Sequence, residues 1–357
     1  MSAVRSTKNS LRNGLGLAVF LLVALALVAG QLLRTNMLTE GYTALDSYID
    51  GTAPRPFAYR ALLPEIMRGI NAVTPASAQA ALDRLGERIA GFGMTRWKIR
   101  TGPQNRFPRD IFWLGVLQFA SVVGYGLVSG SLYSAICGEA NGNRWAIATA
   151  MLLFVAPIVL RGLGHIYDMT LLFFMSCLLR AMASERHMLY LLIFAVSCVN
   201  KETTILMSVA FAAVFFQRME TPRYVAMLAA QLVVFLAIYL ILRVIFLHNP
   251  GSGVEVHWHE EFGYYRSHLR NGFMVAIFFI AIALFFILLT FRWSSKAPFL
   301  RRAAVMIVPQ MALVLYGAAP GEVRNLYEIL PLISMLMLSS AASMWHILRS
   351  GAVGDAT

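Results

Sequence analysis

Long apolar stretches alternate with short polar ones from the first residues of this chain almost to its last. A stretch of roughly 17 to 25 mainly apolar residues is what an α-helix needs to cross the hydrocarbon core of a bilayer. The pattern predicts an all-α polytopic membrane helix bundle of about ten transmembrane helices, with residues 1–357 as one integral-membrane domain. The predicted spans are residues 14–33, 110–135, 144–161, 167–183, 188–200, 203–217, 223–246, 271–291, 303–318 and 328–348.

Residues 35–109 form the one long segment between predicted spans, and two amphipathic patterns run through it. Apolar positions recur on one helical face in residues 62–70 and again in residues 78–89, with charged side chains elsewhere. Helices of this kind lie at the interface between membrane and water. We therefore expect a long outer loop that carries interfacial amphipathic helices.

Composition agrees with a membrane protein and narrows its partners. Of 357 residues, 58% are hydrophobic and only 13% are charged, and the formal net charge is +12. The basic residues lie in short loops and beside the spans, so nucleic acid is not an expected partner, whereas anionic membrane lipids and lipid-linked phosphates are. The three cysteines are isolated in the sequence and indicate neither a disulfide framework nor a metal site.

Basic residues concentrate in alternate loops, which predicts that these loops and both termini are cytoplasmic. We expect a multi-pass protein of a bacterial inner (plasma) membrane with its active site on the non-cytoplasmic side. The basic residues of these loops and ends are Arg5, Lys8, Arg12, Arg180, Arg186, Arg218, Arg223, Arg292, Lys296, Arg301, Arg302 and Arg349.

Lys201 and Glu202 interrupt the apolar run 188–216, in the sequence VNKETTILMS. One span there would put the basic cluster 292–302 on the wrong side, so two short helices that meet at residues 200–202 fit better. The functional interpretation is a phosphate-binding lysine oriented by neighbouring acids. The alternative is a turn whose lysine reaches the head groups and whose Glu202 caps the next helix.

The first outer loop supplies candidate acids and cations. Asp46 and Asp50, in LDSYIDG, are one helical turn apart, and either carboxylate is a candidate general base. The alternative is a solvated loop in which Asp50 begins a turn. Arg55 and Arg60, in PRPFAYR, bracket an aromatic pair and are candidates to bind a phosphate, or else to anchor on ordinary lipid head groups.

Two later segments add polar residues at the same side of the membrane. GHIYDM places His165 and Asp168 on one helical face, although an acid at a helix start is also a good cap. GEVRNLYE places Glu322, Arg324 and Glu328 between two spans, as a polar loop or as a source of another guanidinium for the pocket. We include Glu322 and Arg324 among the predicted substrate-binding residues.

Metal and nucleotide chemistry have little support. VHWHEE, residues 256–261, has no further ligands at a diagnostic spacing, so a solvated loop is favoured over a metal site. The chain contains no GxxxxGK[ST], GxGxxG, GxSxG or HExxH motif, so a nucleotide-driven pump or a standard serine or zinc hydrolase lacks support. We expect no cofactor, with a divalent metal ion as an option.

The arrangement of a first span, a long outer loop with acids and interfacial helices, and polar residues at the outer ends of later spans resembles the GT-C superfamily of integral-membrane glycosyltransferases. In this resemblance Asp46 and Asp50 occupy the place of the essential acid, and His165, Asp168, Lys201, Glu202 and Arg324 the outer ends of later spans. The resemblance implies transfer of a sugar from a polyprenyl-phosphate-linked donor to an acceptor hydroxyl, with inversion at the anomeric carbon.

Two other functions use the same charges. One is a flippase or transporter of lipid-linked saccharides, in which the charges line a substrate pathway. The other is a polysaccharide polymerase or ligase that uses the same lipid carrier with larger glycans. Confinement of the polar groups to one side argues against alternating access.

Overall fold

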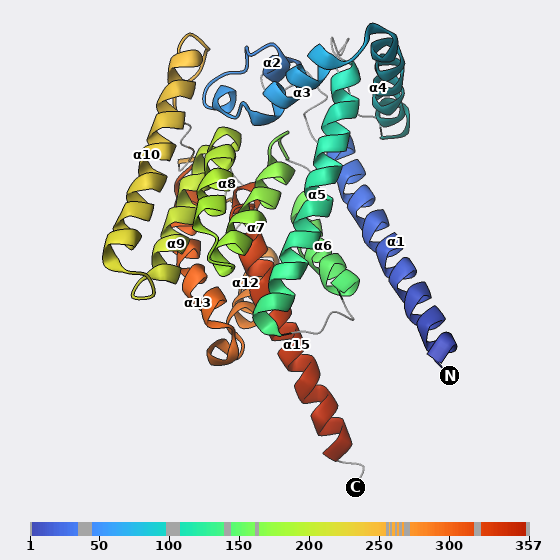
Figure 1. Ribbon diagram of the computed structural model, residues 1–357, viewed down its shortest axis with the longest axis vertical. Coiled ribbons are helices and arrows are strands. Elements are labelled where there is room, and N and C mark those ends of the chain that lie inside the picture. The colour runs from blue at the N-terminus through green and yellow to red at the C-terminus, as the bar shows by residue number, and fades with distance from the viewer. Residues whose placement is uncertain are drawn as a thin grey trace.

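The computed structural model describes residues 2–34, 45–97, 108–138, 144–160, 164–254, 257, 259, 260, 263, 266, 267, 272–317 and 323–354. Within these residues all regular secondary structure is helical, and no strand occurs (Figure 1). The predicted all-α class is confirmed.

The helices follow one another along the chain with few residues between them; η denotes a 3-10 helix. The first group is α1 (Ser2–Arg34), α2 (Leu45–Ile49), η2 (Phe57–Tyr59), α3 (Leu62–Val73), α4 (Ala76–Trp97), α5 (Pro108–Cys137), α6 (Arg144–Leu160) and α7 (Asp168–Ala183). The second group is α8 (His187–Asn200), η4 (Glu202–Leu206), α9 (Met207–Phe215), α10 (Thr221–Ile245), α12 (Gly272–Thr290), η5 (Trp293–Ser295), α13 (Pro298–Ala303), η6 (Ala304–Met306), α14 (Ile307–Gly317), η7 (Val323–Leu326) and α15 (Leu330–Gly354).

Six stretches of the described chain are long and apolar enough to cross a membrane, and they indicate a multi-pass membrane protein. They are Arg12–Leu32, Pro108–Cys137, Thr221–Ile245, Val275–Ser295, Pro298–Leu315 and Leu330–Arg349. The other predicted spans correspond to α6, α7, α8 and η4 with α9, each of 17 residues or fewer. At a rise of about 1.5 Å per residue they extend roughly 25 Å or less, below the ~30 Å hydrocarbon core. A count of ten crossings therefore stays a prediction.

Helix α5 is central, because α1, α4, α6, α7 and α15 all pack against it. Small residues permit this close approach. A Cβ atom at Gly126 would lie 2.6 Å from the ring of Phe20 in α1, and one at Gly130 would lie 3.2 Å from the backbone of Ala148 in α6. A substitution that enlarges either glycine would push neighbouring helices apart.

Helices α8 and α9 run antiparallel as a hairpin. The rings of His187 and Phe215, at the far ends of the two helices, have centroids 5.0 Å apart. At the other end the hydroxyls of Ser197 and Thr204 lie 2.8 Å apart. The two short helices meet at residues 200–202, the arrangement that we inferred from the sequence.

Helices α2 and α3 lie across one end of the bundle, and both chain ends lie at the opposite end (Figure 1). Helix α4 packs against α5. Helices α3 and α4 coincide with the two amphipathic patterns of the first loop. Their placement at a membrane interface stays a prediction.

The end of α10 is tied to the first loop by four hydrogen bonds, which we call the α10 clamp. Asn249 Nδ2 donates to the carbonyl oxygens of Gly51, at 2.7 Å, and of Ala53, at 2.8 Å. The Arg55 backbone N–H donates to the carbonyl of Pro250 at 2.7 Å, and its guanidinium donates to that of Gly251 at 2.8 Å. The loop before α3 and the end of α10 are thereby fixed to each other.

Candidate functional site

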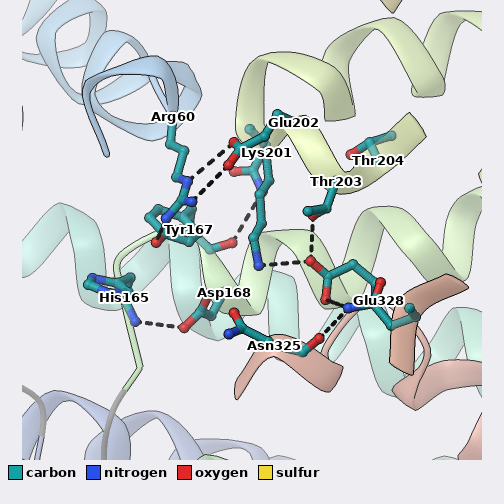
Figure 2. Close-up of polar contacts among 12 residues, drawn as sticks. Arg60, His165, Tyr167, Asp168, Lys201, Glu202, Thr203, Thr204, Asn325 and Glu328 are labelled. Carbon is teal, nitrogen blue, oxygen red and sulfur yellow. Dashed lines mark hydrogen bonds and ion pairs between the residues drawn. The ribbon is translucent and has the colours of Figure 1, made fainter. Parts of the chain in front are cut away.

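Arg60 and Glu202 form a two-point ion pair at the end of the bundle covered by α2 and α3 (Figure 2). Arg60 Nη2 lies 2.8 Å from Glu202 Oε1, and Arg60 Nε donates to Oε2 at 3.3 Å. The planar guanidinium matches a carboxylate in this way, and such pairs are stronger and more directional than single contacts. The side chains are 10% and 28% exposed, so the pair is accessible from outside the protein core.

Aromatic rings hold the Arg60 guanidinium in place. Its central carbon lies 4.5 Å from the ring centroid of Tyr167 and 5.1 Å from that of Phe57. Arg60 Nη1 also donates to the Tyr167 hydroxyl. Cation–π contacts of this kind add to the ion pair and fix the plane of the guanidinium. The aromatic pair that the sequence places beside Arg60 thus contributes one of its two rings.

Both members of this pair are charged at neutral pH. Burial raises the pKa of Glu202, but the positive charge and hydrogen bonds of Arg60 lower it further, so the net shift is downward. Burial lowers the pKa of Arg60, and Glu202 raises it by more. The site therefore contains a stable guanidinium and a stable carboxylate.

Lys201, the residue before Glu202, pairs in the other direction with Glu328 (Figure 2). Its Nζ lies 2.8 Å from Glu328 Oε1, and the two side chains are 5% and 1% exposed. The Thr203 hydroxyl donates to the same oxygen, and Gln310 Nε2 donates to Oε2 at 3.3 Å. Gln310 Nε2 also donates to the carbonyl of Asn325. Buried charges need such partners, and this pair has them on both carboxylate oxygens.

The GHIYDM segment connects the two pairs. Asn200 Nδ2 donates to the carbonyl of Tyr167 at 3.2 Å. The His165 ring stacks on that of Tyr167 with centroids 5.2 Å apart, and its backbone N–H donates to Asp168 Oδ2 at 2.6 Å. Asp168 thus satisfies a backbone donor at the start of α7, as the capping alternative requires, and its charge also acts on Arg60.

The two acids of the first loop lie on one short helix but in different surroundings. Asp46 is in the first turn of α2 and is half-buried, whereas Asp50 follows α2 and is exposed. The Asp50 backbone N–H donates to the carbonyl of Asp46 at 2.8 Å, as expected for one helical turn. Asp46 is near enough to act electrostatically on Asp110, which is fully buried and accepts a hydrogen bond of 2.6 Å from Asn71. Of the two, Asp46 is the acid in a partly enclosed site.

Two small hollows lie on either side of the Arg60–Glu202 pair. The first, which we call the loop hollow, is lined by residues of the first loop, α3 and the end of α10, among them Tyr48, Gly51, Arg60, Pro64, Arg68 and Phe246. The second, which we call the α8–α10 hollow, is lined by Tyr59, Cys198, Glu202, Phe235, Ile238, Tyr239 and Leu242. Arg60 faces the first hollow and Glu202 the second, so the pair separates them.

The remaining predicted residues stand apart from this cluster. Arg55 belongs to the α10 clamp. Glu322 lies outside the described residues, as does the side chain of Arg324, whose backbone is in η7. Among described residues, no three His, Cys, Asp or Glu side chains are grouped to hold a metal ion. His257 pairs with Glu260 at 3.2 Å on an exposed surface.

The sequence analysis gave no role to several residues that complete the site. Glu328, Tyr167 and Gln310 hold the cations or their partners, and Asp110 lies beside Asp46. Their signal in the sequence is weak: Gln310 is a neutral polar residue inside an apolar run. Asp110 stands at the beginning of a span, where an acid is ordinary.

No protein-family profile matches this chain, and neither does any curated protein or solved structure.

Proposed function

We propose that this chain is a membrane glycosyltransferase that moves a sugar from a polyprenyl-phosphate-linked donor to an acceptor hydroxyl. The observation that carries the proposal is the position of the Arg60–Glu202 pair between two hollows. One hollow is bounded by the apolar face of α10, a candidate span, and the other by the polar first loop. Transfer from a lipid phosphate needs an apolar approach for the chain, a polar approach for the acceptor and a cation where they meet.

Asp46 is the first choice as general base in this reaction. It accepts the proton of the acceptor hydroxyl, whose oxygen then forms a bond to the anomeric carbon. The bond from that carbon to the phosphate oxygen breaks, and the electron pair leaves with the polyprenyl phosphate. Attack opposite to the leaving phosphate gives inversion. Asp50, one turn away and exposed, is the second choice.

Arg60 is the first choice to stabilise the leaving phosphate. Its guanidinium is fixed by two rings and is 10% exposed, whereas Lys201 is buried against Glu328. The charge of the phosphate grows as its bond to the sugar breaks, so a preorganised guanidinium favours the transition state. An arriving phosphate would take over one of the two hydrogen bonds that Arg60 now donates to Glu202.

The site is proposed to face the non-cytoplasmic side. Most of the basic loops predicted from the sequence join helix ends remote from Arg60, at the end of the bundle where the termini lie (Figure 1). Short basic loops remain in the cytoplasm. The first loop and the α8–η4 turn would then be outside, where lipid-linked sugars are used as donors.

The proposal is tested with purified protein in nanodiscs and a panel of synthetic short-chain polyprenyl-phosphate hexoses and pentoses. Enzymatic transfer releases polyprenyl phosphate, and Asp46→Asn lowers the rate at least about 100-fold while the protein stays folded. Glu65→Gln, which changes an exposed acid of α3, serves as the control and keeps the wild-type rate. Wild-type rates in both Asp46→Asn and Asp50→Asn overturn the general-base assignment. Movement of intact donor between leaflets without release indicates a carrier instead.

A further inference from the structure

The α8–α10 hollow opens toward a helix face that lies at the outside of the bundle. Ile238 and Leu242 of α10 contribute to its wall, while Leu236, Leu240 and Ile241 of the same helix are 43%, 57% and 57% exposed. A candidate span that exposes such side chains faces the hydrocarbon of the bilayer. The hollow is therefore reached from the side, through the membrane.

An arginine stands at the mouth of this hollow. Arg243 directly follows Leu242, is exposed, and places its guanidinium carbon 5.2 Å from the ring centroid of Tyr239. It also donates a hydrogen bond to the hydroxyl of Tyr59. Tyr59 and Tyr239 both line the hollow, so the guanidinium is fixed at its rim rather than free to follow head groups.

The charge of Arg243 differs from that of the other cations nearby. Arg60 is balanced by Glu202 and Lys201 by Glu328. The groups that act most strongly on Arg243 are Tyr59 and Tyr239, which are neutral at physiological pH. An anion that reaches the rim of the hollow therefore meets a net positive charge. A phosphodiester, which carries one negative charge, matches one guanidinium.

We propose that the α8–α10 hollow admits the chain of a phosphate-bearing isoprenoid lipid from the bilayer and that Arg243 binds its phosphate. The identity of the lipid rests on the proposed function. As it stands the hollow is about the size of one water molecule, so the chain enters by separating α10 from α8. The α10 clamp holds the far end of α10 against the first loop, so this separation takes place along the helix, beside Ile238.

The test measures binding of undecaprenyl phosphate to the full chain in phosphatidylcholine nanodiscs. Arg243→Ala is expected to weaken binding at least tenfold, with Arg243→Lys between it and the wild type because lysine keeps the charge but lacks the fork. Ile238→Trp, which fills the hollow, is expected to weaken binding while leaving Arg243 in place. Arg223→Ala, at the other end of α10 and also exposed, is the matched control and binds as the wild type does.

Competing ligands separate the sources of phosphate. Inorganic phosphate and phosphatidylglycerol are expected to compete poorly, because one lacks a chain and the other lacks an isoprenoid. Competition by phosphatidylglycerol equal to that of undecaprenyl phosphate would show an ordinary lipid contact, and equal competition by inorganic phosphate would show an adventitious anion site. Unchanged binding in both Arg243→Ala and Ile238→Trp overturns the inference. Thermal unfolding of each variant in detergent checks that it is folded.

The outcomes keep this inference apart from the proposed function. Binding that depends on Arg243 and Ile238, together with no transfer from any donor, supports the lipid site and removes the glycosyltransferase. Transfer with a rate and a KM for lipid donor that are unaffected by either substitution does the reverse. Asp46→Asn is expected to bind undecaprenyl phosphate as the wild type does, because Asp46 acts on the acceptor.

Discussion

Lys201 Nζ lies 2.8 Å from Glu328 Oε1, and this buried contact ties the turn between α8 and η4 to the residues just before α15. The adjacent Glu202 reaches Arg60, 142 positions earlier in the chain. Two consecutive residues thus connect three segments that are remote in sequence. The opposite charges of this dipeptide are accommodated because each has its own partner.

Removal of one member of the buried pair is expected to be costly. Lys201→Met leaves the Glu328 carboxylate in the protein interior without its cation, and the free energy of unfolding is expected to fall by about 3 to 5 kcal/mol. The double variant Lys201→Met/Glu328→Leu is expected to lose less than Lys201→Met alone. Equilibrium unfolding in mixed micelles measures both values.

The control for this prediction is the exposed pair of Arg68 and Glu65 in α3, whose side chains are 41% and 55% exposed. Arg68→Met is expected to change stability by less than about 1 kcal/mol. Equal losses in Lys201→Met and Arg68→Met would contradict a special role for the buried pair.

The Arg60–Glu202 pair predicts a stability difference at acid pH. The pKa of Glu202 is lower in the folded protein than in the unfolded chain, so its contribution is complete above the unfolded pKa, about 4.3. This contribution is lost as the pH falls through the folded pKa, because the folded state then takes up the proton. The gap in melting temperature between wild type and Glu202→Gln is expected to narrow below pH 4. A gap that is constant from pH 7 to pH 3 would show that Glu202 does not titrate differently on folding.

Lys296 predicts a change at alkaline pH. This side chain is 2% exposed and donates to the Leu336 carbonyl at 2.7 Å and to the Ser340 hydroxyl at 2.5 Å. Burial lowers the pKa of Lys296 to about 8. Between this value and the ordinary pKa of lysine the unfolded chain holds a proton that the folded protein has released, so stability rises with pH.

The measurement is thermal unfolding in detergent from pH 7 to pH 10 for the wild type and for Lys296→Met. The wild type is expected to gain stability relative to the variant over this range. Arg292→Met, an exposed cation four residues earlier, is the control and is expected to follow the wild type. A difference between wild type and Lys296→Met that does not vary with pH would contradict the prediction.

Gly86 predicts a large effect of one methyl group. A Cβ atom there would lie 1.8 Å from the carbonyl oxygen of Pro108, so alanine would force α4 away from the start of α5. Gly86→Ala is expected to destabilise the protein by about 1 to 3 kcal/mol. Gly69, inside α3, has open space around its Cβ position. Gly69→Ala is expected to stabilise by up to about 1 kcal/mol, since alanine favours the helix. Equal melting temperatures for the two variants would contradict this packing.

The helical class and the hairpin of α8 and α9 were predictable because apolar runs and the charges that interrupt them are local features of the sequence. The crossing number was not, because α7 and α8, with 16 and 14 residues, are too short for length and apolarity to decide. Their ends are set by polar contacts, such as those of Asn200 and Tyr167, which no periodicity predicts.

Part of the candidate site was predictable for a similar reason. A cation in an apolar run needs a partner, which singled out Lys201 and Glu202, and an arginine between aromatic residues singled out Arg60. The identity of each partner was not predictable, because which acid meets which cation depends on how the helices pack. Arg243 was missed because an arginine at the end of a span is ordinary, and only the two tyrosines beside it make it distinctive.

Both ends of the chain emerge at the end of the bundle away from α2 and α3 (Figure 1). Fluorescent or enzymatic reporters fused to the first and last residues would therefore occupy the same compartment. Such fusions would leave the first loop and the rim of the α8–α10 hollow unobstructed, so the protein can be followed in living cells, or immobilised by either tail, with its ligand-facing side open.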